Sequence, residues 1–168
     1  MEQINSAIKI AAEAHDGQTD KTGKPYIWHP LTVASFCKSE KAKIAAVLHD
    51  VIEDTDVTAA DLLKAGIDAD VVDAVVRLSK NKGEELSAYY DRVAASDIAT
   101  EVKFADMLHN SELSRFAGSA VSAEYALKIT SRYAERMKIL YGKPGVKEKF
   151  QRLCAPETAA RVLEKMKI

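Results

Sequence analysis

Residues 41–54 read KAKIAAVLHDVIED, and this stretch decides the fold class. Its large apolar residues recur at spacings of three and four, the period of one face of an α-helix. These residues are Ile44, Val47, Leu48, Val51 and Ile52. We therefore predict one helix from about Lys41 to Asp54, with an apolar stripe facing the core and a polar face opposite to it.

The residues before this stretch predict two more helices. A first helix has its apolar face marked by Ile4, Ala7, Ile8, Ala11 and Ala12. Asp16-Gly17 ends that helix, and the aperiodic residues from Gly17 to His29 indicate a loop. Pro30 suits the first turn of the next helix, so we expect His29 to lie at a helix entrance.

The residues after this stretch continue the helical pattern to the end of the chain. Thr58 and Asp61 have the spacing of a capping box, which predicts a short helix that ends at Gly66. Further helices are predicted at about Ala69–Ser79, Glu84–Ala95, Asp97–Phe116, Ser122–Tyr141, Val146–Leu153 and Pro156–Met166. Because no stretch alternates with period two, we predict an all-α helical bundle formed as a single domain by residues 1–168.

Composition limits the classes of partner. The 168 residues include 24 Lys and Arg against 25 Asp and Glu, a net charge of -1, which argues against nucleic acids and anionic membrane surfaces as partners. No apolar stretch has the length of a membrane span or the form of a secretory signal. The isolated Cys37 and Cys154 are expected to be reduced thiols. These features predict a cytoplasmic protein. They leave open whether it forms a homo-oligomer.

The polar face of residues 41–54 carries one imidazole and three carboxylates, from His49, Asp50, Glu53 and Asp54. A solvated helix face is one explanation. However, no Lys or Arg lies between Lys43 and Lys64 to offset five acids. The acids also gather near the helix C-terminus, where each carboxylate is unfavourable by about 0.3 to 1 kcal/mol. A bound cation would relieve both problems, so the pattern favours a metal site.

The helix that begins near Asp97 offers a second polar arc. Its predicted core stripe is Ile98, Val102, Ala105 and Leu108. Lys103, Asp106 and Asn110 share the flanking arc, and these residue types suit a metal-bound phosphate, although an ordinary ion pair between Lys103 and Asp106 is the alternative. Imidazoles and carboxylates without thiolate suit Mn²⁺, Fe²⁺ or Zn²⁺, and such a metal can activate water near neutral pH.

These motifs resemble a known family. A histidine in YIWHP (26–30), the doublet His49-Asp50, EDT (53–55) and KFAD (103–106) match, in order, the signature of HD-domain phosphohydrolases. More narrowly, GKPYIWHP, VLHDVIEDT and VKFADMLHN resemble the alarmone hydrolase domain of the RelA/SpoT family in its short, single-domain form. The resemblance spans residues 4–116, and residues 117–168 are expected to form supporting helices.

The resemblance implies a hydrolase that removes pyrophosphate from the 3′ position of guanosine tetra- or pentaphosphate, the alarmones of the stringent response. Its implied metal ligands are His29, His49, Asp50 and Asp106, usually for Mn²⁺, with Fe²⁺ or Zn²⁺ as alternatives. By the same resemblance, Glu53 and Asp54 position or activate the attacking water, and Lys21 and Asn110 contact the substrate. We further infer that Lys103 neutralises negative charge on the phosphate.

Two other functions remain open. The family usually places an Arg-Lys pair where this chain has Asp20-Lys21, so an HD-type phosphohydrolase acting on another nucleotide or phosphorylated small molecule is the main alternative. A non-catalytic module that binds a nucleotide or a metal is the second alternative. The presence of both Glu53 and Asp54 weakens it, because metal binding does not require them. Arg115 is a candidate substitute for the Arg that the family places two residues after its Asn.

The remaining aromatic residues receive structural interpretations. His15 is interpreted as a helix-end or core histidine, and His109 as a supporting residue beside the polar arc at best. Tyr26 and Trp28 are expected to pack beneath His29, with stacking on a base as the alternative.

Overall fold

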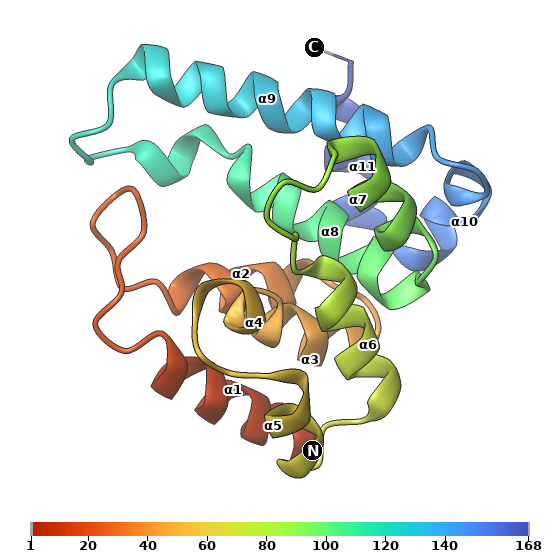
Figure 1. Ribbon diagram of the computed structural model, residues 1–168. Coiled ribbons are helices and arrows are strands. Elements are labelled where there is room, and N and C mark those ends of the chain that lie inside the picture. The colour runs from red at the N-terminus through yellow and green to blue at the C-terminus, as the bar shows by residue number, and fades with distance from the viewer. Residues whose placement is uncertain (1, 168) are drawn as a thin grey trace.

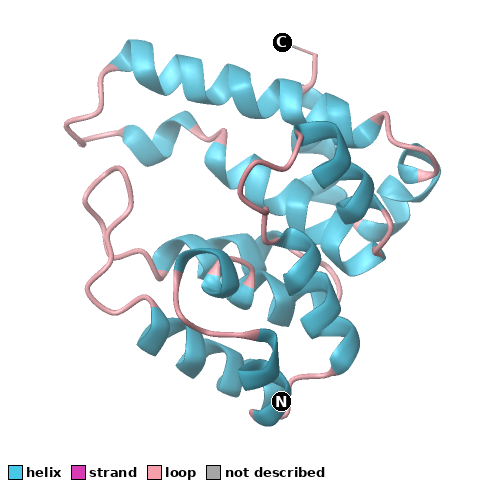
Figure 2. Ribbon diagram, in the orientation of Figure 1, coloured by secondary structure: helices cyan, strands magenta, loops and turns pink. Residues whose placement is uncertain are grey.

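The computed structural model describes residues 2–167, and in this part of the chain it contains helices and no strand, so the all-α prediction is confirmed (Figure 2). The elements, in chain order, are α1 (Glu2–Ala14), α2 (Trp28–Phe36), α3 (Glu40–Leu48), α4 (Val51–Asp54), α5 (Ala59–Lys64), α6 (Ala69–Leu78), α7 (Leu86–Ala94), α8 (Asp97–Asn110), the 3-10 helix η1 (Leu113–Phe116), α9 (Ala123–Tyr141), α10 (Val146–Leu153) and α11 (Pro156–Lys165).

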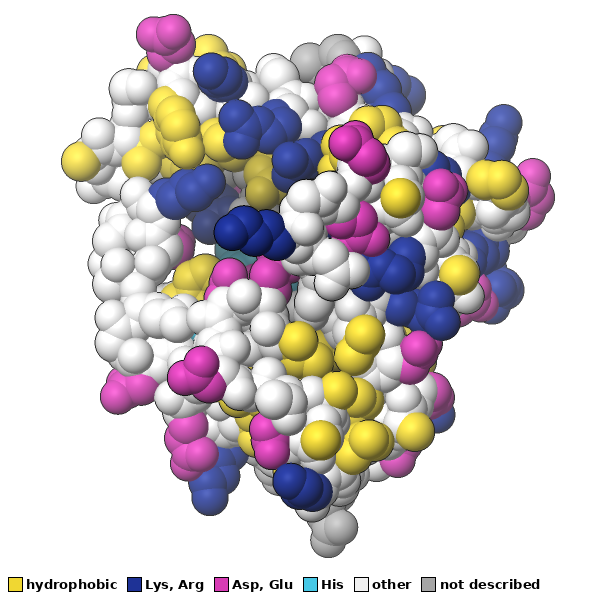
Figure 3. Space-filling view, viewed as in Figure 1, with side chains coloured by type: hydrophobic (Ala, Val, Ile, Leu, Met, Phe, Trp, Pro, Cys, Tyr) yellow, Lys and Arg dark blue, Asp and Glu magenta, His cyan; other side chains and the backbone are white. Residues whose placement is uncertain are grey.

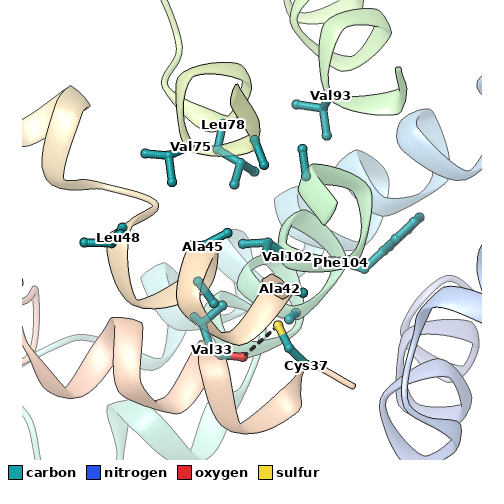
Figure 4. Close-up of a cluster of buried hydrophobic side chains, with 14 of the residues drawn as sticks. Val33, Cys37, Ala42, Ala45, Leu48, Val75, Leu78, Val93, Val102 and Phe104 are labelled. Carbon is teal, nitrogen blue, oxygen red and sulfur yellow. Dashed lines mark hydrogen bonds between the residues drawn. The ribbon is translucent and has the colours of Figure 1, made fainter. Parts of the chain in front are cut away.

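Helices α3 and α8 lie at the centre of the bundle and pack against each other. In the view of Figure 1, α1 runs along the lower edge, α9 along the upper edge, and α8 between them. The core joins residues of several helices, among them Val33, Ala45, Val75, Val102 and Phe104 (Figure 4). This packing fixes α3 and α8, the two helices whose polar residues were predicted to form a site.

Helix α3 is buried on more sides than its predicted stripe requires. Val47, Leu48 and Ala45 are all at most 1% exposed, and Ala42 and Ala46 are fully buried as well. α1, α2, α6 and α8 all pack against α3, and its alanines leave room for their close approach. The predicted stripe is therefore correct but too narrow.

The prediction of one unbroken helix from Lys41 to Asp54 is wrong. α3 ends at Leu48, and α4 begins at Val51 after a turn formed by His49 and Asp50. The His49 ring atom Nδ1 lies 2.7 Å from the carbonyl oxygen of Ala46 and donates to it. A histidine near a helix end can satisfy one of the last carbonyls in this way. The interruption turns the His49-Asp50 doublet toward the interior.

The predicted helix Asp97–Phe116 is also too long, because α8 ends at Asn110 and η1 follows. The carbonyl oxygen of Ser111 accepts hydrogen bonds from Thr130 on α9, at 3.2 Å, and from Lys165 on α11, at 3.1 Å. These partners come from helices far along the chain, so the helical period of residues 97–116 does not reveal them.

The predicted helices after residue 57, apart from Asp97–Phe116, begin and end within two residues of the observed ones. The face of α1 is partly different, since Ala7 and Ala11 are fully buried whereas Ile8 is 37% exposed. Cys37 and Cys154 are both buried, and their thiols are free. Within the described residues, no helix has both the length and the apolar character needed to cross a membrane.

Candidate active site

Three segments that are distant in sequence bring the four candidate metal ligands together. His29 is the second residue of α2, His49 and Asp50 form the turn between α3 and α4, and Asp106 lies on α8. Their side chains are almost fully buried, with Asp50 the most exposed at 19%. The residues that the resemblance implied as ligands thus share one interior position.

The loop before α2 is held in a compact turn that sets the entrance of the helix. Asp20 donates its N–H to the carbonyl oxygen of Lys24 at 2.8 Å, and Thr19 pairs with Pro25 in an isolated antiparallel bridge. Gly23 has a φ of 80°, a conformation that favours glycine. His29 then follows within the first turn of α2, as predicted for a histidine at a helix entrance.

The ligand atoms of His29, His49 and Asp50 lie within 4.8 Å of one another, and Asp106 lies beside both imidazoles. His29 Nε2 lies 3.3 Å from Asp106 Oδ1 and 3.7 Å from Asp50 Oδ2. His49 Nε2 lies 2.9 Å from Asp50 Oδ2 and 3.8 Å from Asp106 Oδ1. Donor atoms that bind one ion at about 2.1 Å are themselves about 3 to 4 Å apart. The spacing is therefore that of ligands arranged around a single divalent cation.

His49 provides a direct test of whether these residues fit a metal. Its Nδ1 is occupied by the Ala46 carbonyl, and its Nε2 is buried without a hydrogen-bonding partner of suitable geometry among the described residues. In the neutral imidazole this leaves the Nε2 lone pair directed toward carboxylate oxygens, an arrangement that needs a positive charge. A proton or a metal ion can supply it, so the donor set fits a divalent cation.

Opposite charges in the cluster stabilise each other's ionised forms. Burial alone would lower the pKa of His49, but the carboxylates of Asp50 and Asp106 outweigh burial and raise this pKa to about 9. Burial would raise the pKa of Asp106, but the Lys103 ammonium, 2.8 Å away, holds this pKa well below its usual range. The two aspartates therefore remain ionised and able to bind a cation at neutral pH.

Glu53 and Asp54 lie at the edge of the cluster and line the cavity beside it. Partial burial raises the pKa of both carboxyl groups, and the charge of Asp50 adds to this effect. A Glu53 oxygen also accepts the backbone N–H of Lys80 at 2.7 Å. Among the described residues, neither carboxylate belongs to the closely spaced group of His29, His49 and Asp50, and neither lies within 4.0 Å of an imidazole nitrogen as Asp106 does. Both thus remain available to contact a water or a substrate.

A cavity of about 360 Å³ opens in front of the cluster. Its lining includes the acidic residues Asp20, Asp50, Glu53, Asp54 and Asp106 and five basic residues, Lys21, Lys80, Lys103, Arg115 and Arg136. Aromatic rings of Tyr89, Tyr90, Tyr133 and Phe116 complete the lining. In Figure 3, a hollow on this face has basic side chains along its upper edge and acidic side chains along its lower edge.

The predicted substrate-binding residues occupy different places around the cavity. Lys103 pairs with Asp106, as its alternative interpretation held, and also lines the cavity. Asn110 donates to Asp106 Oδ1 at 2.5 Å and accepts from Arg115 at 2.6 Å. Lys21 lies on the exposed rim. A polar chain thus runs from Arg115 through Asn110 to a candidate metal ligand.

Two aromatic residues near the cluster differ in how well the sequence predicted them. The Tyr26 ring packs edge-on against His29 with centroids 5.6 Å apart, as predicted, and its hydroxyl donates to Asp50 Oδ2. Trp28 is 61% exposed, and the prediction that it packs beneath His29 is wrong. The first position of α2 directs the indole outward, toward solvent. His15 is buried at the end of α1 and packs on Tyr26, as predicted for a helix-end histidine.

His109 lies closer to the cluster than the sequence indicated. Its Nδ1 is 2.7 Å from Nδ1 of His29, and the two rings lie edge to edge in nearly parallel planes with centroids 4.9 Å apart. Burial, followed by the neighbouring His29 and Arg115, lowers the pKa of His109 to about 3. Its position three residues after Asp106 on one helix was the only signal that could have indicated this contact.

Comparison with known proteins places this geometry in a family. A model of the HD domain matches residues 7–106, which include all four candidate metal ligands. The chain belongs to the HD-domain family. Divalent-metal binding goes with this fold, and in this HD domain His29, His49 and Asp50 form a group able to hold an ion.

Curated relatives of this HD domain are enzymes of alarmone metabolism. It is 41% identical over 89 residues to a guanosine-3′,5′-bis(diphosphate) 3′-pyrophosphohydrolase of Vibrio cholerae, a match that covers 49% of this chain. It is 40% identical over 88 residues to the bifunctional (p)ppGpp synthase/hydrolase SpoT of Escherichia coli, again over 49% of this chain. The matched segment spans only 12% of either relative's length.

Two further relatives cover more of this HD domain. A 3′-pyrophosphohydrolase of Spiroplasma citri is 32% identical over 154 residues, which is 82% of this chain and 21% of that protein. A solved structure, described as a metazoan ortholog of SpoT that hydrolyzes ppGpp and plays a role in starvation responses, superposes with a TM-score of 0.67 at 25% identity. That match covers 89% of this chain and 94% of the other, so the two folds correspond over nearly their whole lengths.

Proposed function

We propose that this HD domain hydrolyses guanosine 3′,5′-bis(diphosphate)-type alarmones and releases pyrophosphate from the 3′ position. The observation that carries the proposal is a single cavity lined both by residues of the His/Asp cluster and by five basic residues. The reaction is that of the 3′-pyrophosphohydrolases of Vibrio cholerae and Spiroplasma citri, and the metazoan SpoT ortholog of similar fold also hydrolyzes ppGpp. We treat residues 1–168 as one functional unit.

His29, His49, Asp50 and Asp106 are the residues that hold the metal in this proposal. Mn²⁺ is the proposed ion, because nitrogen and carboxylate donors without thiolate suit it, and Fe²⁺ or Zn²⁺ are alternatives with the same donors. When bound, such an ion lowers the pKa of a water and neutralises charge on a phosphoryl oxygen. Tyr26 assists by donating to Asp50, which fixes the orientation of that carboxylate.

Glu53 and Asp54 handle the proton of the attacking water. The water oxygen forms a bond to the phosphorus next to the ribose 3′-oxygen, the bond between this phosphorus and the 3′-oxygen breaks, and the 3′-oxygen leaves with a proton. The partial burial that raises the pKa of both carboxyl groups makes each a better proton acceptor than a free carboxylate.

The basic residues of the cavity bind the phosphates. Lys103 is fixed by Asp106 at 2.8 Å, with its ammonium 5.4 Å from the centroid of the Tyr89 ring. A cation held in this way can stabilise charge that develops on a phosphate without reorganising during the reaction. Lys21 and Arg136 line the same cavity and are placed to bind the second diphosphate.

The proposal is tested with the purified full chain, Mn²⁺ and guanosine 3′,5′-bis(diphosphate). We expect equal amounts of pyrophosphate and guanosine 5′-diphosphate, loss of turnover on chelation and recovery when Mn²⁺ is restored. Glu124→Gln, which alters an exposed residue of α9 outside the cavity, is the matched control and should retain full activity. Absence of pyrophosphate under saturating metal would contradict the proposal.

One observation favours a different substrate for the same chemistry. Asp20 stands where the family usually has an arginine, and its carboxylate accepts from Thr22 at 2.6 Å and lies 3.4 Å from Arg115. The loop therefore presents an ion pair to the nucleotide in place of a free arginine. A panel of guanine and adenine nucleotides, assayed for both phosphate and pyrophosphate, separates the two substrates. Faster turnover of a nucleotide without a 3′-diphosphate would favour the second candidate.

A further inference from the structure

Two imidazole rings meet directly behind the candidate metal centre. The Nδ1 atoms of His29 and His109 are 2.7 Å apart, and the ring planes are inclined by only 19°. Nitrogens at this distance require a proton between them, because two lone pairs would repel each other. One of the two rings must therefore donate and the other must accept.

The other nitrogen of His29 decides which ring donates. His29 Nε2 faces the cluster, 3.3 Å from Asp106 Oδ1 and 3.7 Å from Asp50 Oδ2. A ring that binds a metal through Nε2 must keep a lone pair on that atom, so the proton of neutral His29 belongs on Nδ1. His109 Nδ1 is then the acceptor, and the His109 proton lies on its own Nε2.

The surroundings of His109 hold it in this accepting position. His109 lies on α8, the helix that also carries Asp106, so the acceptor and a metal ligand are fixed to one rigid element. The Phe36 ring of α2 packs edge-on against His109 with centroids 6.3 Å apart. His29 and His109 both line a second cavity, of about 500 Å³, whose lining does not include Asp50 or Asp106. His109 therefore contacts the cluster through His29.

We propose that His109 is a positioning residue, which accepts the Nδ1 proton of His29 and thereby fixes the tautomer and the ring orientation that present Nε2 to the metal. Metal-binding histidines generally donate a hydrogen bond from the N–H of their second ring nitrogen to a carboxylate, a carbonyl or a water. In this chain an imidazole takes that place. The inference rests on the metal centre of the proposed function and is independent of the substrate.

Two substitutions distinguish the loss of the hydrogen-bond acceptor from the loss of the aromatic ring. His109→Phe keeps an aromatic ring against His29 and Phe36 but removes the acceptor. His109→Asn is smaller but places an amide oxygen near the position of Nδ1, so it restores the acceptor. Ser114→Ala is the control, because Ser114 lines the same second cavity without contacting either imidazole.

The primary measurement is the affinity of the metal-free protein for Mn²⁺, by calorimetry or electron paramagnetic resonance, without substrate. We expect His109→Phe to bind about 10 to 100-fold more weakly, the range for loss of a supporting partner of a ligand. His109→Asn should lie closer to the wild type than to His109→Phe, and Ser114→Ala should match the wild type. Folded His109→Phe with wild-type affinity would overturn the inference.

Nitrogen NMR of the imidazole rings in the wild-type protein, loaded with diamagnetic Zn²⁺, gives a second answer that needs no variant. We expect His29 to show a protonated Nδ1 and a metal-bound Nε2, and His109 to show an unprotonated Nδ1 and a protonated Nε2. A proton on His109 Nδ1 would overturn the inference. Because neither experiment uses a nucleotide, failure of the proposed activity would leave both results interpretable.

Discussion

His49 links the protonation of this HD domain to its metal. In the metal-free protein, the carboxylates of Asp50 and Asp106 raise the pKa of His49 to about 9, against the opposing effect of burial. The ring is therefore protonated at pH 7, whereas a metal ligand must be neutral. Metal and proton compete for the same Nε2 atom.

This competition gives a pH dependence with a defined sign. Metal binding at pH 7 should release at least one proton, and the affinity for Mn²⁺ should rise as the pH rises toward about 9, the pKa of His49. Above that pH the dependence on His49 should disappear, because the ring is already neutral. Calorimetry in buffers of different ionisation enthalpy measures the protons released. An affinity that stays constant from pH 6 to pH 8 would contradict this description of His49.

Substitutions of Glu53 and Asp54 should lower turnover without weakening metal binding. Glu53→Gln and Asp54→Asn keep the size of each side chain but remove a proton acceptor. We expect kcat to fall by about 10² to 10⁴-fold, the usual contribution of a general base. Mn²⁺ affinity should change little, since neither residue is one of the four proposed ligands. Parallel titration of metal and steady-state kinetics check both parts. If kcat is unchanged in both variants, neither carboxylate acts on the water.

For single helices, the sequence predicted which residues share a face better than it predicted where each helix ends. The apolar periods located α3 and α8 and placed Lys103, Asp106 and Asn110 on one side of α8, which the contacts of Asp106 bear out. The end of α3 at Leu48 and the end of α8 at Asn110 were missed, because side-chain and distant partners take the carbonyls there.

The same reasoning explains which site residues the sequence could indicate. The structure brings the residues carried by family motifs together around one cavity, and their type and order in the sequence sufficed to single them out. The contact between His29 and His109 and the position of Arg115 depend on how α2, α8 and η1 pack, and helical spacing alone does not specify this packing. The partner of a site residue is thus harder to predict than the residue itself.

The start of α8 offers a test that is independent of the metal. Ser96 caps this helix by accepting from the N–H of Ala99 at 3.2 Å. Ser96→Ala should lower the free energy of unfolding by about 1 kcal/mol. Ser96→Asp, which retains a capping oxygen, should lose less. Urea unfolding measures both values. Because Asp106 lies at the other end of α8, Mn²⁺ affinity should be unaffected, and a loss of affinity in Ser96→Ala would show that the two ends are coupled.

Across the whole molecule, a net charge of -1 conceals an uneven distribution. One cavity is lined by the acidic cluster, which suits a metal ion, and by five basic residues, which suit phosphate groups. The cluster also joins α2, the turn after α3, and α8, which are separate in sequence. An ion bound there ties together the elements that form the centre of the bundle.

Metal binding should therefore stabilise the entire fold. At a free Mn²⁺ concentration 100 times its dissociation constant, the free energy of unfolding should rise by about 2.7 kcal/mol. Thermal unfolding with and without chelator measures the effect. Asp106→Asn should remove most of it, because a neutral amide replaces a candidate ligand. An equal increase in stability in this variant and the wild type would place the ion elsewhere.

The most direct test of the proposed reaction follows its products by ³¹P NMR in ¹⁸O-labelled water. Guanosine 3′,5′-bis(diphosphate), Mn²⁺ and the intact chain should yield guanosine 5′-diphosphate and pyrophosphate, with one ¹⁸O atom in the pyrophosphate and none in the nucleotide. Release of orthophosphate, or ¹⁸O in the nucleotide, would contradict water attack on the phosphorus next to the 3′-oxygen.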